Sequence, residues 1–307
     1  MPCPLRGTAI YGKGMEDDSA VIEQLRAAVD RRLADLLPDH NARPARLAEA
    51  ARYAALSPGK RFRPMLTLLT AREFGAEPLA ALDAACAFEM VHAASLILDD
   101  LPSMDDAALR RGRATTHRAF DEATAILAAV GLLNHAFGVI AGDARLPEAA
   151  RGELVRRLSG SVGFQGLVSG QALDLNDRDH ARTSDDIDLL NHRKTGVLMV
   201  AAAEAGALIA GTSQAVVTAV GEFARHLGLA FQIHDDLIDA ALIAEAGKDL
   251  GKDADMATLV TVLGPQGAAA AVGAHLEAAE AALARAGCTG LLARYAFGLF
   301  EARKAAA

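Results

Sequence analysis

Helix-forming sequence runs through this chain of 307 residues almost without interruption. Apolar residues recur at helical spacing, and no stretch alternates apolar and polar residues for long enough to predict a strand. The segments "ACAFEMVHAASLIL" and "KTGVLMVAAAEAGALIAG" have no polar stripe, which predicts helices that are buried on most faces. No linker rich in Pro, Gly and Ser divides the chain. We therefore expect an all-α fold with a single domain over residues 1–307, in which residues 1–18 form a loosely ordered N-terminal segment.

Chain-breaking residues separate the helical patterns. The expected helices cover about residues 19–37, 47–56, 65–74, 79–98, 120–141, 148–159, 162–174, 185–210, 215–240, 267–286 and 290–304. The glycines of "SGSVGFQGLVSGQ" are interpreted as sites of close helix packing or a kink.

Composition excludes several classes of protein. The net charge of −8 does not suggest a nucleic-acid partner. Three widely separated cysteines without metal-binding spacing indicate a reduced, cytoplasmic protein. No N-terminal apolar segment typical of a signal peptide is visible. No uncharged apolar run reaches about 18 residues, so we expect no transmembrane segment.

The first candidate site follows the apolar run that ends in "LILDDLPSMDD". Asp99 and Asp105 would lie about 240° apart on a straight helix. Pro102, however, breaks the helix and disfavours helical geometry at the residue before it. A turn after Asp100 can therefore return Asp105 to the side of Asp99, with the arginines of "RRGR" close behind.

A second acidic cluster, "FQIHDDLIDA", ends another apolar helix. Asp235 and Asp239 are one turn apart and lie within about 40° of the same face, so they repel unless a cation holds them. Carboxylates without His or Cys favour Mg²⁺ over zinc. The alternative is a solvated helix end, although the apolar neighbours Phe231 and Ile233 favour burial.

Two acidic clusters with nearby arginines fit a diphosphate bridged by metal ions, because Arg binds phosphate oxygens in a bidentate way. No GxxxxGK[ST] loop is present, so a P-loop nucleotide site is not supported. Glu89 and His92 match one ExxH element of a di-iron bundle, but the second element that such a site needs is missing. Taken alone, His92 also fits a core histidine, and "RRGR" fits a solvated turn.

The motifs that carry a family resemblance are "GKRFRP", "DDLPSMD", "RRG", "GQALDL", "KTG", "FQIHDDLID" and "GKD", in this order. With them the chain resembles the trans-isoprenyl diphosphate synthases, the polyprenyl synthetase family, over nearly its whole length. It looks most similar to bacterial geranylgeranyl diphosphate synthases of carotenoid biosynthesis. The resemblance implies an isoprenoid-synthase bundle of about ten to thirteen helices around a deep central cavity, which is usually a homodimer.

The resemblance also implies the reaction and its residues. Isopentenyl diphosphate would condense with an allylic diphosphate by ionisation, condensation and elimination, with about three Mg²⁺ ions per site. The metal set would be Asp99, Asp100, Asp105, Asp235 and Asp239. The allylic diphosphate would be held by Arg110, Lys194 and Lys248, and the diphosphate of isopentenyl diphosphate by Lys60, Arg63, His92 and Arg111. Thr195 and Gln232 would lie near the allylic carbon that becomes cationic.

Product length is expected to depend on the helix that leads to Asp99. One isoprene unit is roughly as long as one helical turn of 5.4 Å. Ala94 and Ser95, about one turn before Asp99, are small and leave room for a C20 product. A deeper stop would come from Met90 or Val91. Farnesyl diphosphate is the alternative product.

The chain departs from the family pattern after "GKD". The family usually carries a second lysine there, whereas this chain has Asp255 and Met256, and Lys252 is the expected substitute. This departure keeps open a non-catalytic partner subunit. A terpene cyclase or head-to-head synthase is a further alternative, but it would not need a second diphosphate pocket of the kind that Lys60, Arg63 and Arg111 form.

Overall fold

The computed structural model of the chain describes residues 15–39, 41–176, 183–246 and 258–304. The helices are α1 (Met15–Leu36), α2 (Ala45–Ala55), α3 (Phe62–Glu73), η1 (Pro78–Ala81), α4 (Leu82–Asp99), α5 (Thr116–Ala119), α6 (Glu122–Gly142), α7 (Glu148–Val162), α8 (Leu167–Asn176), α9 (Ser184–Asn191), η2 (His192–Gly196), α10 (Val197–Ile209), α11 (Gln214–Ala246), α12 (Leu259–Ala286) and α13 (Leu291–Lys304). The expected all-α fold is confirmed.

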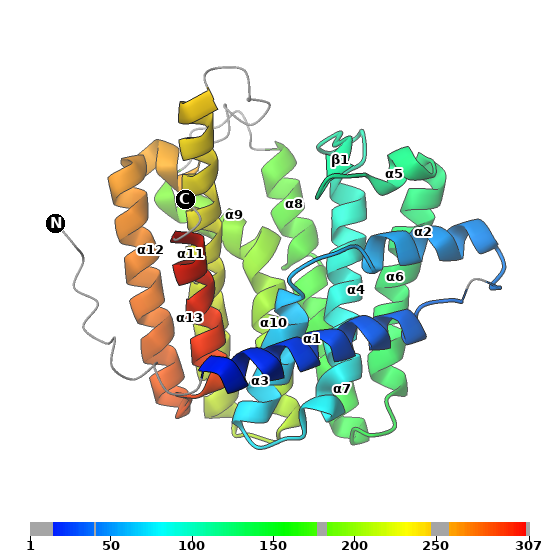
Figure 1. The fold of residues 1–307 in the computed structure, drawn as a ribbon, viewed down its shortest axis with the longest axis horizontal. Coiled ribbons are helices and arrows are strands. Elements are labelled where there is room, and N and C mark those ends of the chain that lie inside the picture. Colours follow the sequence, from blue (N-terminus) through cyan, green and yellow to red (C-terminus); the bar gives the residue numbers. More distant parts are fainter. Residues whose placement is uncertain (1–14, 40, 177–182, 247–257, 305–307) are drawn as a thin grey trace.

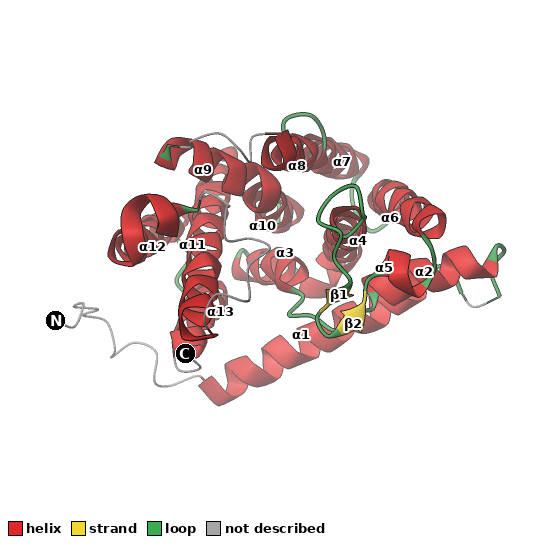
Figure 2. Ribbon diagram, turned by 90° about the horizontal axis from the view of Figure 1, so that it is seen from above, coloured by secondary structure: helices red, strands yellow, loops and turns green. Residues whose placement is uncertain are grey.

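Helix α4 lies inside the bundle. In Figures 1 and 2 it runs alongside α3, α6 and α10, while α1 crosses these helices on one side. Phe88 and Met90 on α4 have no exposed surface. Burying a side chain of this kind contributes about 1.5–3 kcal/mol. The absence of a polar stripe on α4 is therefore explained by neighbours on every side.

The chain between residues 184 and 209 forms three elements where the sequence predicts one helix. Helix α9 ends at Asn191, and residues His192–Gly196 form a turn of π-helix before α10 begins. An inserted residue turns the following helical face by about 100°, but the segment "KTGVLMVAAAEAGALIAG" has no polar stripe in which that turn could be read. Such insertions occur frequently at functional sites. The insertion contains the "KTG" motif.

A short hairpin joins α4 to α5. Strand β1 (Leu109–Arg110) pairs antiparallel with β2 (Arg113–Ala114), and Arg110 lies opposite Arg113. Strands of two residues give no readable alternation in the sequence. The hairpin carries the arginines of the "RRGR" motif.

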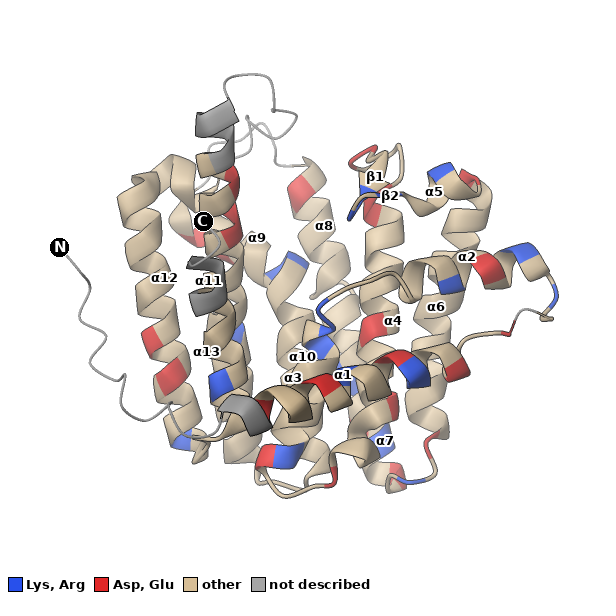
Figure 3. Ribbon diagram, viewed as in Figure 1, with Lys and Arg blue, Asp and Glu red and all other residues tan. Residues whose placement is uncertain are grey.

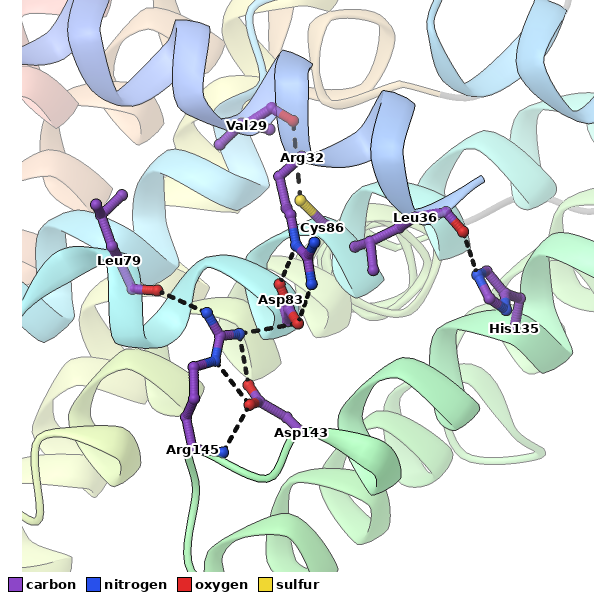
Figure 4. Close-up of polar contacts among 9 residues, drawn as sticks. All are labelled: Val29, Arg32, Leu36, Leu79, Asp83, Cys86, His135, Asp143 and Arg145. Carbon is purple, nitrogen blue, oxygen red and sulfur yellow. Dashed lines mark hydrogen bonds and ion pairs between the residues drawn. The ribbon is translucent and has the colours of Figure 1, made fainter. Parts of the chain in front are cut away.

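Buried charges connect α1, α4 and the α6–α7 loop (Figure 4). Asp83 on α4 accepts hydrogen bonds from Arg32 Nε at 2.6 Å and Nη2 at 2.8 Å, and it pairs with Arg145 Nη2 at 2.8 Å. Arg145 also pairs with Asp143, just after α6. Although burial opposes it, hydrogen bonding to Arg32 holds the pKa of Asp83 below its ordinary value. This network is far in sequence from the acidic motifs.

Helix α1 begins at Met15, a few residues before the start expected at residue 19. Asp18 on this helix pairs with Arg294 of α13 at 2.5 Å. Residues 1–14 lie outside the described part.

Among the residues that the structure describes, three helical segments are long and apolar enough to cross a membrane by length and composition: Pro78–Asp99, Glu122–Gly142 and Leu259–Ala286. Residues 123–142 and 259–276 contain no Asp, Glu, Lys or Arg, so the expectation that no uncharged apolar run reaches about 18 residues was wrong for these two segments. In the segment Pro78–Asp99, 72% of the most apolar 18-residue stretch is buried, so most of its apolar residues pack in the protein core. In α6, by contrast, Ile126, Leu127 and Val130 are exposed.

Candidate active site

The first aspartate motif forms a loop that folds back on the end of α4. Helix α4 ends at Asp99, and the backbone N–H of Asp105 donates to the Asp99 carbonyl at 3.0 Å. A second backbone bond joins the N–H of Ala107 to the carbonyl of Asp100 at 3.2 Å. The turn expected from Pro102 is thus present, and it brings Asp105 back to Asp99.

The Asp99 carboxylate has a buried oxygen atom that a cation would stabilise. Its Oδ1 atom is buried and accepts no hydrogen bond, and Lys194 Nζ lies 3.8 Å from it. Burial raises the pKa of Asp99, and the nearby Asp105 carboxylate adds to this although Lys194 opposes it. A buried carboxylate oxygen without a donor is a poor arrangement unless a cation completes it.

Asp100 and Arg110 form a pair with each other. Arg110 Nε donates to the two carboxylate oxygens of Asp100 at 2.8 and 3.0 Å, and its Nη2 lies 2.7 Å from Oδ1. Arg110 Nη2 also lies 3.9 Å from Asp99 Oδ2. Asp100 is buried, and its contacts support a role in holding Arg110 at the rim of the aspartate motif.

Lys194 connects two helices through their carboxylates. Its Nζ donates to Asp174 Oδ2 of α8 at 2.8 Å, in addition to its approach to Asp99 of α4. Burial acts against its charge, but Asp99 and Asp174 raise the pKa of Lys194 above its ordinary value, so it stays protonated. A side chain at Gly170 would collide with the backbone of Lys194, which confirms the interpretation of this glycine as a close-packing site.

Asp174 was not among the residues singled out from the sequence, although it lies in the quoted motif "GQALDL". It is 1% exposed. A carboxylate in an otherwise apolar helix was the available signal, because a buried Asp needs a charged partner. Its partner is 20 residues away in sequence and could not be read from spacing.

The second aspartate motif lies on α11, where polar side chains form a chain of contacts. Thr195 Oγ1 donates to Gln232 Oε1 at 3.4 Å, and Gln232 Nε2 donates to Asp236 Oδ1 at 3.0 Å. Burial raises the pKa of Asp236 to about 6, and the neighbours Asp235 and Asp239 contribute. Thr195 and Gln232, predicted to act together, are thus in contact.

Acidic segments lie towards the same end of α4, α8 and α11 in Figure 3. Within the described residues, no three Asp, Glu, His or Cys side chains are close enough to form a complete metal site. Mg²⁺ is commonly held by one or two carboxylates together with waters and substrate phosphate oxygens. The distributed carboxylates and the buried Oδ1 of Asp99 therefore fit Mg²⁺ better than a metal that needs a full protein cage.

The predicted second diphosphate pocket is basic and partly buried. Burial lowers the pKa of Arg63 to about 10, and Arg111 contributes while Glu89 opposes. Burial, with Arg63 and Arg111 next in effect, lowers the pKa of His92 well below its ordinary value, so His92 is neutral. Two mutually repelling guanidinium groups beside a neutral imidazole form an environment that an anion stabilises.

The neighbouring Arg61 has a structural role. It is buried and pairs with Glu89 at 2.9 Å and Asp30 at 2.7 Å, which neutralises it. Lys60 lies next to it in the loop before α3. Lys248 and Lys252, predicted to bind diphosphate, lie outside the described residues, as do Asp255 and Met256.

The residues predicted to set product length lie along α4. Met90, Val91 and Ala94 are 0%, 1% and 2% exposed, whereas Ser95 is half-buried and donates to the His92 carbonyl at 2.9 Å. All four precede the aspartate motif on the same helix.

Comparison with known proteins agrees with this arrangement. Residues 44–272 match the family model for polyprenyl synthetase. The chain is 47% identical to a geranylgeranyl diphosphate synthase of Pantoea ananas, covering 86% of this chain and 87% of that protein. It is 42% identical to a farnesyl diphosphate synthase of Geobacillus stearothermophilus, covering 85% and 89%.

A solved structure of an FPP/GFPP synthase from Zymomonas mobilis superposes with a TM-score of 0.80 at 35% identity, covering 91% of this chain and 96% of that one. The family resemblance noted in the sequence is confirmed by the family model, by both relatives and by this structure. The chain belongs to the polyprenyl synthetase family of prenyltransferases.

Proposed function

We propose that the protein is a Mg²⁺-dependent short-chain trans-prenyltransferase that condenses isopentenyl diphosphate with an allylic diphosphate. The observation that carries this proposal is the position of Lys194. Its ammonium group lies between Asp99 of α4 and Asp174 of α8, so a fixed positive charge stands beside the first aspartate motif. Mixed charge of this kind suits a metal-bridged diphosphate and its departure as a leaving group.

The acidic side of the site would hold Mg²⁺ through Asp99, Asp105 and Asp235, with Asp239 in support. When bound, the metal neutralises charge that develops on the departing diphosphate. Lys194 and Arg110 contribute positive charge to the same leaving group, with Lys248 as a third proposed contact. Asp100 acts through Arg110, which it holds with three contacts of 3.0 Å or less.

The basic side of the site would bind isopentenyl diphosphate through Lys60, Arg63, His92 and Arg111. Diphosphate would offset the burial that lowers the pKa of Arg63, because it adds a negative charge beside the two arginines. This second anion pocket favours chain elongation over a terpene cyclase, which needs only one diphosphate.

The reaction breaks the allylic C–O bond and leaves a delocalised cation. The double bond of isopentenyl diphosphate attacks it to form the new C–C bond, and a proton then leaves, with the released diphosphate as the acceptor. Thr195 and Gln232, which contact each other, place oxygen dipoles near the cation. The apolar walls of α4 exclude the water that would quench it.

We propose geranylgeranyl diphosphate, C20, as the product, with farnesyl diphosphate as the alternative. The small side chains of Ala94 and Ser95 support the longer product. Relatives named for each product lie at 47% and 42% identity, so identity alone does not separate them.

We propose a cytoplasmic homodimer. The apolar residues Ile126, Leu127 and Val130 on α6 are 42%, 57% and 56% exposed, which supports association through that helix. Light scattering of the purified protein measures the mass directly; a monomer at micromolar concentration would refute this part.

The test is condensation by the purified protein alone. Isopentenyl diphosphate and Mg²⁺ are supplied with dimethylallyl, geranyl or farnesyl diphosphate, and products are resolved by chain length. We expect Asp99→Ala to abolish condensation while the circular dichroism spectrum remains helical. Full turnover by Asp99→Ala would refute the assignment. An inactive wild-type homodimer would favour the non-catalytic partner subunit instead.

A further inference from the structure

The hairpin that carries Arg110 and Arg111 has a strained turn. Arg111 and Gly112 connect β1 to β2, and their φ angles are 53° and 76°. A two-residue turn with two positive φ values is the type I′ geometry, which normally has Asn or Asp before the glycine. An arginine with positive φ costs energy, so other contacts must hold the turn.

The two arginines are held differently. Arg110 is fixed by the buried Asp100 through three short contacts. Arg111 donates from Nη1 to the Pro58 carbonyl at 2.8 Å and rests on Gly59, where any side chain would collide with it. The position of Arg111 thus depends mainly on the hairpin itself and on the loop before α3.

Helix α2 holds the hairpin from the other strand. The Tyr53 hydroxyl donates to the Ala114 carbonyl at 2.8 Å. The guanidinium carbon of Arg113 lies 4.2 Å from the centre of the Tyr53 ring, a cation–π distance. Arg113 Nη1 also donates to Ser57 Oγ at 3.4 Å, and Ser57 Oγ donates to the Tyr53 carbonyl at 2.7 Å.

Tyr53 is itself well supported. Its ring packs edge-on against Phe120, with centroids 5.6 Å apart. Arg46, also on α2, lies over the Phe120 ring at 5.7 Å, donates to the Phe120 carbonyl and pairs with Asp121 at 2.8 Å, and these residues lie outside the hairpin. Through its contacts with Ala114 and Arg113, Tyr53 therefore fixes strand β2 relative to helix α2.

We infer that Tyr53 and Arg113 are positioning residues that hold Arg111 in place for the second diphosphate. This inference rests on the proposed function, in which Arg111 binds isopentenyl diphosphate. Because Asp100 fixes Arg110 independently, loosening the hairpin at β2 affects the isopentenyl diphosphate pocket more than the allylic one. The effect appears in the KM for isopentenyl diphosphate and leaves the KM for geranyl diphosphate nearly unchanged.

Steady-state kinetics of the full-length protein tests this split. Tyr53→Phe removes the hydrogen bond and keeps the ring, and Tyr53→Ala removes both contacts. For Tyr53→Phe we expect KM for isopentenyl diphosphate to rise about threefold, the loss typical of one hydrogen bond. For Tyr53→Ala we expect a rise of about tenfold, because a cation–π contact is lost as well. Arg113→Gln should resemble Tyr53→Phe in size, and Arg113→Lys should recover part of the loss. Arg46→Gln, on the same helix, is the matched control and should match the wild type.

Trypsin provides a readout that needs no activity. The hairpin contains three arginines within four residues, so its release exposes cleavage sites at residues 110–113. Tyr53→Ala should be cleaved there faster than the wild type and Arg46→Gln.

Equal increases in both KM values, or cleavage at the wild-type rate, would overturn the inference. If wild-type protein makes no product, the proposed function fails, and the cleavage rates alone decide whether Tyr53 holds the hairpin.

Discussion

Replacing Asp174 by asparagine tests whether Lys194 must be held between two carboxylates. Asp174 is 1% exposed, and the Lys194 side chain is 30% exposed. Asparagine can still accept the hydrogen bond that now spans 2.8 Å, so geometry is largely retained while the negative charge is lost. Asp99 Oδ1 remains 3.8 Å from Lys194 Nζ, so the ammonium group keeps one carboxylate neighbour. The variant therefore isolates the charge-assisted part of the contact.

The charge-assisted part of the Asp174–Lys194 contact amounts to about 1–2 kcal/mol. This is the difference between a charge-assisted and a neutral hydrogen bond, reduced by solvent screening of the partly exposed ammonium group. If the contact aligns Lys194 with the leaving diphosphate, kcat/KM for the allylic substrate falls about five- to thirtyfold. KM for isopentenyl diphosphate should be unchanged, since Lys60, Arg63 and Arg111 are untouched. Initial rates of diphosphate release at varied geranyl diphosphate measure the effect.

Asp143→Asn is a matched control. Asp143 is also buried, and Arg145 donates to it at 2.8 and 2.9 Å, but it lies just after α6 in the network of Figure 4. This variant should lose stability and keep its kinetic constants. If Asp174→Asn keeps kcat/KM for geranyl diphosphate within twofold of the wild type, or behaves like the control, the alignment of Lys194 by Asp174 is refuted.

Three further predictions use other parts of the molecule. Ala94→Phe should shorten the product towards C15, and an unchanged product distribution on chromatography would remove Ala94 from the floor of the cavity. Asp83→Asn should lower the free energy of unfolding by about 2 kcal/mol in urea melts at pH 7, less than for a fully buried pair because both arginines are partly exposed. Because the folded pKa of Asp83 is lowered, its contribution is present above the unfolded pKa of about 3.9 and is lost as pH falls through the folded value, so equal losses at pH 7 and pH 3 would contradict it. In a Cys3→Ser background, Cys288 should resist a thiol reagent at pH 8 until the protein unfolds, because burial raises its pKa to about 12; rapid native labelling would show otherwise.

The sequence predicted those parts of the site that depend on local rules. Pro102 predicted the loop that returns Asp105 to Asp99, and one-turn spacing predicted the acidic face on α11. Helical periodicity predicted the all-α fold. It did not predict the π-helical turn at residues 192–196, because the apolar segment that follows has no polar stripe in which a shift of the helical face could be read. That turn nevertheless carries Lys194 and Thr195.

Long-range pairings were beyond sequence reasoning. Asp174 meets Lys194 across 20 residues, and Tyr53 meets Ala114 across 61. Neither separation corresponds to a helical or strand period, so only the packing of helices makes these contacts. Arg110 and Asp100 show the same limit at short range, since their pairing depends on a hairpin whose strands have two residues each.

Burial destabilises charged groups of opposite sign on the two sides of the site. On the acidic side, burial raises the pKa values of Asp99 and Asp236, so each carboxylate is less stable charged than in water. On the basic side, burial and Arg111 lower the pKa of Arg63. The acidic groups lie on α4 and α11, whereas Arg63 lies on α3 and Arg111 in the turn between β1 and β2. Under the proposed function, a cation on the acidic side and a diphosphate on the basic side would relieve both costs, and ligands that bind only the folded state stabilise it by mass action. The groups that burial destabilises in the free site are therefore the ones that we propose bind the metal ion and the diphosphate.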